Sequence, residues 1–211
     1  MGITERRERE RKEVREKILD AARELFVAEG YEAVTMRKVA EKIEYSPTAI
    51  YFHFRDKEAL MRELCDADFA ALSAEFQKIG RIPDPIERLR RIGRAYVGFA
   101  VAFPNHYRLM FMTPHPVAKC SDERQAIRGN PEQDAYAFLK VTVEESIATG
   151  RLKPEFADPE LVSQMVWSGV HGVVSLQIAK RDDDWVAWRD VKMTAHQLIE
   201  VMISGLVRSR S

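Results

Sequence analysis

Apolar residues recur at three- and four-residue steps along most of the chain, the spacing that places them on one face of an amphipathic helix. Gly30 follows the first stripe and is suited to end its helix in a left-handed conformation. Alternating apolar and polar positions, as in strands, are absent. The pattern predicts an all-α protein. The first stripe consists of Val14, Ile18, Ala22, Leu25 and Phe26.

Three shorter elements follow. Thr35 is a favourable N-cap for one short helix. Ser46 caps a second, with Pro47 in its first turn. Asp56 then caps a long helix that Pro83 stops, because proline lacks the amide hydrogen. Two short helices joined by about three residues and packed on an amphipathic helix are the parts of a helix-turn-helix.

The remainder of the chain is also predicted to be helical. Asn130 is expected to cap one of its helices and Asp158 another, each followed by a proline in the first turn. The chain is expected to divide into a helix-turn-helix domain over residues 12–64 and a larger helical domain over residues 65–211. The expected helices of the second part are 85–103, 105–112, 131–149, 159–180 and 185–208.

The charge balance gives no sign of a nucleic-acid partner. The chain has 33 Lys and Arg residues against 33 Asp and Glu residues. A DNA-binding surface must therefore arise from local placement of cations. Between residues 35 and 57, five basic residues face three acidic ones, which is a small local excess.

Composition also bears on the compartment. The N-terminal segment is densely charged, which is unlike a secretory signal. No apolar run is long enough to cross a membrane. Two cysteines without Cys-x-x-Cys spacing suit a reducing compartment. The expectation is a cytoplasmic protein with no membrane partner.

The second short helix carries side chains suited to DNA. Its leading residues would face base edges if the helix entered a major groove. Pro47 and Ala49 offer apolar contacts for a thymine methyl group, Thr48 offers a hydroxyl, and Tyr51 can donate to a phosphate. Lys57, in the first turn of the next helix, would point at the same phosphate. These residues predict contact with double-stranded DNA.

This segment resembles a known family of regulators. The stretch from Thr35 to Leu60, with its core Ile50-Tyr51-x-His53-Phe54-x-x-Lys57, is similar to the DNA-binding domain of the TetR family. The resemblance covers about residues 14–64 and departs from the family at Glu44, where a glycine is usual in the turn. It implies DNA-contacting positions at Arg37, Thr48, Ala49, Tyr51, His53 and Lys57.

Each of these residues has a second interpretation. The aromatic residues from Tyr51 to Phe54 would also suit a core cluster, above all Phe54. His53 faces DNA or forms a hydrogen bond inside the domain. Arg37 contacts DNA or lies on a solvated face. Glu44 places a carboxylate near the expected phosphates and favours a strained turn.

The two C-terminal helices are apolar around much of their circumference, so they must be buried on several sides. The chain's own core covers one side and a second copy would cover the other. This predicts a homodimer through a four-helix interface. The alternative is a fully internal helical hairpin in a monomer.

The segment Trp167-Ser-Gly-Val-His171-Gly172 resembles the TetR-like regulatory domain known for its Trp–His–Gly motif. The resemblance implies a ligand-binding and dimerisation domain. An apolar pocket with a few polar side chains would serve a small effector, although the same residues also suit a core. Its candidate lining is Tyr96, Phe99, Phe103, Tyr107, Met110, Phe111, Phe138, Trp167 and His171.

No metal-ligand spacing, phosphate-binding glycine loop or nucleophile motif is present in the sequence. No cofactor is expected, and the chain is not expected to be an enzyme. The predicted function is a ligand-responsive transcriptional regulator, a repressor that a small apolar effector releases from its operator. Two alternatives remain: a small-molecule-binding protein whose helix-turn-helix no longer functions, and an all-helical enzyme.

Overall fold

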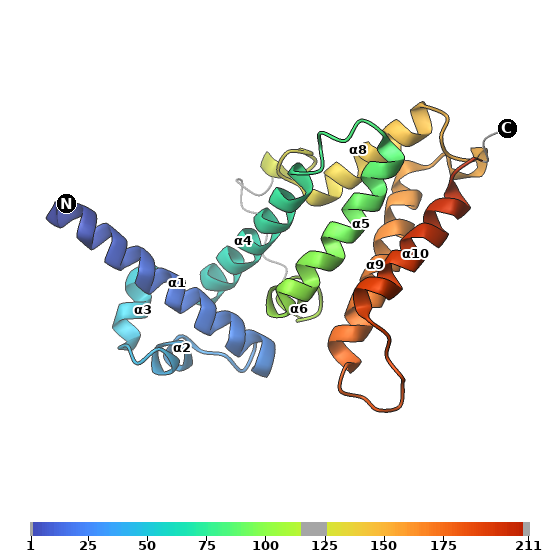
Figure 1. Ribbon diagram of the computed structural model, residues 1–211. Helices are drawn as coiled ribbons and strands as arrows, with labels where there is room; N and C mark the ends of the chain where they lie inside the picture. The colour runs from blue at the N-terminus through green and yellow to red at the C-terminus, as the bar shows by residue number, and fades with distance from the viewer. Residues whose placement is uncertain (1, 115–125, 209–211) are drawn as a thin grey trace. The chain divides into compact units, whose positions relative to one another are not determined.

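The computed structural model describes residues 2–114 and 126–208 (Figure 1). Within these ranges the chain is helical apart from turns, a short 3₁₀ helix (η1, Pro154–Phe156) and one isolated bridge between Leu152 and Val207. The predicted all-α class is confirmed. The helices are α1 (Ile3–Glu29), α2 (Met36–Lys42), α3 (Pro47–His53), α4 (Lys57–Gln77), α5 (Pro85–Ala102), α6 (Pro104–Phe111), α8 (Ala135–Ala148), α9 (Pro159–Lys180) and α10 (Val191–Leu206).

The helices form two compact units. One comprises Met1–Asp68 and Asn105–Ser121, and the other comprises Phe69–Pro104 and Asp122–Ser211. The first unit therefore holds α1, α2, α3, the beginning of α4 and nearly all of α6. The predicted domain limits, 12–64 and 65–211, remain a prediction.

The first unit has a small apolar core. Each helix contributes fully buried side chains: Ile18 and Phe26 of α1, Val39 of α2, Ile50 of α3 and Leu60 of α4. Phe54 is also buried, which supports its interpretation as a core residue. This core fixes α3 by its inner face and leaves the opposite face to solvent.

A buried ion cluster joins three helices of the same unit. The carboxylate of Asp68 in α4 is 2% exposed. It accepts hydrogen bonds from Arg23 of α1 at 3.0 Å and from Nδ1 of His106 of α6 at 2.8 Å. Arg23 also donates to Asp20 at 2.9 Å. Because removing one partner of a buried pair costs about 3–5 kcal/mol, this cluster strongly favours the observed placement of α6.

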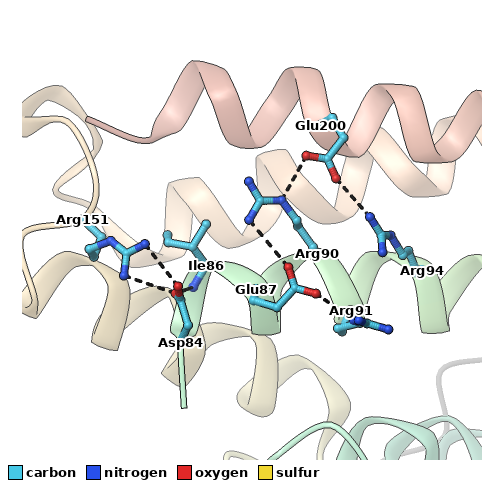
Figure 2. Close-up of polar contacts among 8 residues, drawn as sticks. All are labelled: Asp84, Ile86, Glu87, Arg90, Arg91, Arg94, Arg151 and Glu200. Carbon is cyan, nitrogen blue, oxygen red and sulfur yellow. Dashed lines mark hydrogen bonds and ion pairs between the residues drawn. The ribbon is translucent and has the colours of Figure 1, made fainter. Parts of the chain in front are cut away.

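The second unit is a bundle of α5, α8, α9 and α10. Gly93 lets α5 approach α10 closely, because an added Cβ would lie 2.9 Å from Cδ1 of Ile199. Ion pairs join the same two helices. The carboxylate of Glu200 lies 3.0 Å from the guanidinium of Arg90 and 3.1 Å from that of Arg94 (Figure 2). The bundle is held both by close packing and by charge.

Most predicted caps are confirmed. The side chain of Thr35 accepts from the amide of Lys38, and that of Ser46 accepts from the amide of Ala49. Asp158 caps α9, and its following proline occupies the first turn as expected. The sequence thus specifies these helix starts locally.

Two predicted starts are wrong. The helix expected over 131–149 begins at Ala135, because Asp134, not Asn130, accepts the first free amides. The side chain of Asn130 instead accepts from the amide of Glu132 within a turn. The helix expected over 185–208 begins at Val191 and is capped by Asp190.

The turn between α2 and α3 contains the one departure from the family pattern. Glu44 has a φ of 61°, in the left-handed region that glycine occupies without steric cost. The amide of Tyr45 still donates to the carbonyl of Ala40 at 3.0 Å, so the turn forms. Glu44 therefore adds strain but does not prevent the helix-turn-helix geometry.

We expect Glu44→Gly to raise the free energy of unfolding by up to about 1 kcal/mol, because relief of left-handed strain exceeds the added entropy of the unfolded chain. Urea denaturation measures the change. Glu44→Gln is the matched control, since it removes the charge and keeps the strain. A Glu44→Gly protein no more stable than Glu44→Gln would contradict a conformational origin.

Candidate functional site

The outer face of α3 is open to solvent. Pro47 and Thr48 are exposed, and Tyr51 is 55% exposed. Ala49 is half-buried, and Ile50 holds the helix to the core from the other side. The structure thus leaves Pro47, Thr48 and Tyr51 accessible, whereas Ala49 is partly covered.

Lys57 lies in the first turn of α4, as expected, but its ammonium has partners within the chain. Nζ donates to the carbonyl oxygen of Tyr31 at 2.8 Å and lies 4.2 Å from the centroid of the Tyr31 ring. An ammonium has three donors, so a phosphate can share it. These contacts also tie α4 to the segment that follows α1.

Arg37 is exposed and pairs with Glu41 at 2.7 Å on the same face of α2. An exposed pair of this kind contributes little to stability and exchanges partners readily. Lys38 and Lys42, on the same helix, pair with Glu29 at 2.5 Å and Glu24 at 2.8 Å. The cations of α2 are therefore largely neutralised within the domain.

His53 is half-buried at the end of α3. Burial lowers its pKa, and the positive charges of Arg11 and Arg15 lower it further. Its Nδ1 is buried and has no hydrogen-bond partner in the described part of the chain. The shift favours the neutral imidazole.

Sequence reasoning missed residues of α1 that lie beside α3. The guanidinium of Arg11 is 5.4 Å from the centroid of the Phe52 ring, and that of Arg15 is 4.4 Å from the Phe54 ring. Arg15 also donates to the carbonyl oxygen of His53 at 3.0 Å. The available signal was the four-residue spacing, which continues the buried stripe of α1 into these arginines.

In the second unit, three predicted pocket residues form a hydrogen-bonded cluster. The indole Nε1 of Trp167 donates to the hydroxyl oxygen of Tyr96 at 3.1 Å. That hydroxyl lies 3.1 Å from Nδ1 of His171. Tyr96 is buried, and the other two side chains are half-buried. We call Tyr96, Trp167 and His171 the aromatic cluster.

Tyr136 extends the aromatic cluster and was not predicted. Its ring is 5.8 Å from that of Trp167, and its hydroxyl donates to Glu160 at 2.5 Å. Burial and this hydrogen bond raise the pKa of Tyr136 to about 12. Burial lowers the pKa of His171. These shifts favour a neutral phenol and a neutral imidazole.

The other predicted pocket residues are more scattered. Phe99 and Phe103 contact each other at 5.4 Å between centroids, and Phe103 is 48% exposed. Phe138 lines an open cavity of about 360 Å³ with Gln77, Arg88 and Thr142, among others. A separate set belongs to the first unit, namely Tyr107, Met110 and Phe111.

The described ranges contain neither a metal-binding group of side chains nor a membrane-spanning helix. No group of three or more His, Cys, Asp or Glu side chains in the described ranges is arranged to hold a metal ion. No helix in those ranges is long and apolar enough to cross a bilayer.

Two family models match the chain. Residues 18–64 match the bacterial regulatory proteins of the tetR family. Residues 89–202, more than half of the chain, match the tetracyclin repressor-like C-terminal domain. The chain belongs to the TetR family.

Curated relatives resemble this TetR-family protein over its N-terminal part. An HTH-type transcriptional repressor of Mycobacterium tuberculosis, Rv1474c, is 40% identical over 68 residues, which are 32% of this chain and 36% of the relative. The HTH-type transcriptional regulator TcmR of Streptomyces glaucescens is 32% identical over 94 residues, 44% of this chain and 41% of the relative. The matches thus span well under half of each relative.

Solved structures share the fold across both units. The TetR family regulator PfmR of Thermus thermophilus has a TM-score of 0.70 and 22% identity, covering 91% of this chain and 96% of that one. The fatty acid degradation regulator FadR of Bacillus halodurans has a TM-score of 0.71 and 17% identity, covering 90% and 95%.

Family membership confirms the resemblance found in the sequence and supports a regulator over an enzyme. The Trp–His–Gly subtype stays a prediction, as do the individual DNA-contacting and pocket residues of this TetR-family protein.

The pKa shift of His171 gives a stability prediction. Because burial lowers the pKa of His171 in the folded state, the unfolded chain binds the proton more readily, and stability falls as the pH drops below the ordinary pKa of about 6.5. We expect His171→Gln to lose less stability than the wild type between about pH 7.5 and pH 5.5. The amide oxygen of the glutamine side chain can still accept a hydrogen bond from the hydroxyl of Tyr96.

Chemical denaturation across this pH range measures the effect. His196→Gln, at an exposed position of α10, is the control and should keep the wild-type pH dependence. Identical pH profiles for wild type and His171→Gln would contradict the role assigned to burial.

Proposed function

We propose that this TetR-family protein is a dimeric transcriptional repressor that binds an operator through α3 and leaves it when a small apolar effector binds the second unit. The observation that carries the proposal is the placement of α3, whose inner face is fixed by Ile50 while Thr48 and Tyr51 remain accessible. The named repressor among its relatives supports the sign of regulation. Such a protein acts in the cytoplasm, where bacterial DNA lies.

The DNA contacts follow from this placement. Thr48 and the apolar side chains of Pro47 and Ala49 face base edges in the major groove. Tyr51 donates to a phosphate, and Lys57, which already donates to the carbonyl oxygens of Tyr31 and Glu32, contributes its third donor. Arg37 contacts DNA when its guanidinium leaves the ion pair with Glu41 and pairs with a phosphate instead. His53, neutral and half-buried, supports the end of α3.

A second copy is needed because α9 and α10 expose an apolar stripe opposite their buried faces. In α9 the exposed side chains are Leu161, Met165 and Leu176, at 44–55% exposure. In α10 they are Met193 and Val201, at 52% and 65%. Burying these residues against the same stripe of a second copy gives a two-fold four-helix interface.

The dimer sets two α3 helices in successive major grooves, about 34 Å apart. An effector weakens DNA binding only if it binds better to a conformation with another separation. The aromatic cluster supplies apolar surface together with a phenol and an imidazole, the mixture typical of small-molecule sites. An apolar effector with one or two polar atoms fits this chemistry.

We expect Thr48→Ala combined with Tyr51→Phe to weaken DNA binding by about tenfold or more, since a hydrogen bond to a charged group contributes about 1.5–3 kcal/mol. The DNA is a duplex selected from a random-sequence pool by the wild-type protein. Fluorescence anisotropy measures the affinity.

Both side chains are exposed, so thermal unfolding of the double variant should match the wild type. Unchanged affinity in the variant, or failure of the wild type to select any duplex, would contradict DNA binding through α3.

We expect Val201→Glu to weaken dimerisation by more than about 100-fold, because an unpaired buried carboxylate costs about 3–5 kcal/mol. Sedimentation equilibrium measures the dissociation constant. Val141→Glu, which changes an exposed valine of α8 at 42% exposure, is the matched control and should remain dimeric. A dimeric Val201→Glu protein would exclude this interface.

A further inference from the structure

The N-terminal half of α1 extends beyond the recognised DNA-binding segment. The family match begins at residue 18, whereas α1 is one continuous helix from Ile3 to Glu29. Figure 1 shows this half of the helix running past α3. About four helical turns therefore precede the part of the first unit that the family model describes.

One face of this extension carries a row of arginines. Arg7, Arg11 and Arg15 follow one another at four-residue steps, which places them on one face of the helix. The same face carries Ile18 and Ala22 farther along, where it is buried in the core. The face that packs inward at residue 18 thus becomes cationic as it leaves the core.

Contacts show where this arginine row points. Arg15 donates to the carbonyl oxygen of His53 at the last residue of α3. One turn earlier, Arg11 stacks on Phe52, which is 71% exposed. Arg7 follows another turn away, about 6 Å along the helix. The row therefore passes the C-terminal end of α3 and continues beyond it.

The two outer arginines of the row keep their charge available. Neither Arg7 nor Arg11 lies within 4.0 Å of a carboxylate in the part of the chain that the structure describes. Three carboxylates of the same segment have other partners. Glu5 accepts from the amide of Gly2 at 3.0 Å, Glu10 pairs with Arg6 at 2.7 Å, and Glu16 pairs with Lys12 at 4.0 Å.

The basic residues of α2 differ from Arg7 and Arg11 in having carboxylate partners. There Arg37, Lys38 and Lys42 each pair with a glutamate. Arg15 also pairs with Glu63, so the positive charge of the row that has no carboxylate partner in the described ranges is that of Arg7 and Arg11.

We propose that Arg7 and Arg11 form a second DNA-binding surface, which holds the phosphates that flank the major groove entered by α3. The proposal rests on the proposed function. Phosphate is the ligand class because paired guanidinium groups on a preformed helix bind it with little ordering cost. The ring of Phe52 orients Arg11 by a cation–π contact. The arginine row thus extends the footprint beyond the bases that α3 reads.

The test compares Arg7→Gln/Arg11→Gln with Arg9→Gln/Lys12→Gln. Each double variant removes two positive charges from exposed positions of the same helix, and glutamine preserves helix propensity. The control residues lie on the opposite face of α1. Circular dichroism should show equal helicity. The probe is the duplex selected by the wild-type protein, once with about ten extra base pairs on each side and once trimmed to the selected core.

Two contacts per subunit are four per dimer, so Arg7→Gln/Arg11→Gln should make the slope of log affinity against log salt less negative by about 3 to 4. The control variant should change the slope by less than about 1. Trimming the flanks should weaken the wild type and the control but not Arg7→Gln/Arg11→Gln.

Equal slopes for the two double variants, or equal sensitivity to trimming, would overturn the inference. The wild type would still bind its selected duplex in that case, so the proposed function would stand. A wild type that selects no duplex would overturn both.

Discussion

A single buried carboxylate organises the first unit. Asp68 accepts hydrogen bonds from Arg23 and His106 and thereby joins α1, α4 and α6, helices that are distant in sequence. Apolar packing alone would let these helices slide, because contacts between aliphatic side chains have little directionality. A charged acceptor that is 2% exposed cannot lose a partner without a large cost, so it specifies one arrangement. The position of α1 in turn sets where Arg11 and Arg15 lie relative to the end of α3.

The helix α3 itself is specified by nearby residues, whereas its surroundings depend on residues far away in the sequence. Ser46 and Pro47 start the helix from within the segment itself, and Ile50 attaches it to the core. What lies around the helix depends on residues far away. The ring of Tyr31 and its carbonyl oxygen hold Lys57. Recognition chemistry is thus encoded in a short stretch, while its electrostatic surroundings come from α1 and from the link that follows it.

The same division explains what the sequence predicted. Helix class, the two short helices and their caps depend on residues at most four positions apart, and Thr35, Ser46 and Asp158 behave as expected. The helices α8 and α10 begin later than predicted because Asp134 and Asp190 accept hydrogen bonds from their first-turn amides. In the Asp68 cluster, Asp68 is 45 residues from Arg23 and 38 residues from His106. Trp167 and Tyr96 are 71 residues apart. Helical periodicity in the sequence cannot pair residues at such separations.

The exposed leucine, methionine and valine side chains of α9 and α10 have a consequence for abundance in the cell. In the proposed dimer these side chains are buried against a second copy, so the folding equilibrium would depend on the concentration of the chain. Freshly synthesised copies would be the most vulnerable to proteolysis when expression is low. Doubling the gene dosage would then raise the amount of assembled protein more than twofold. Supply of the protein itself thus becomes a control variable alongside any small molecule.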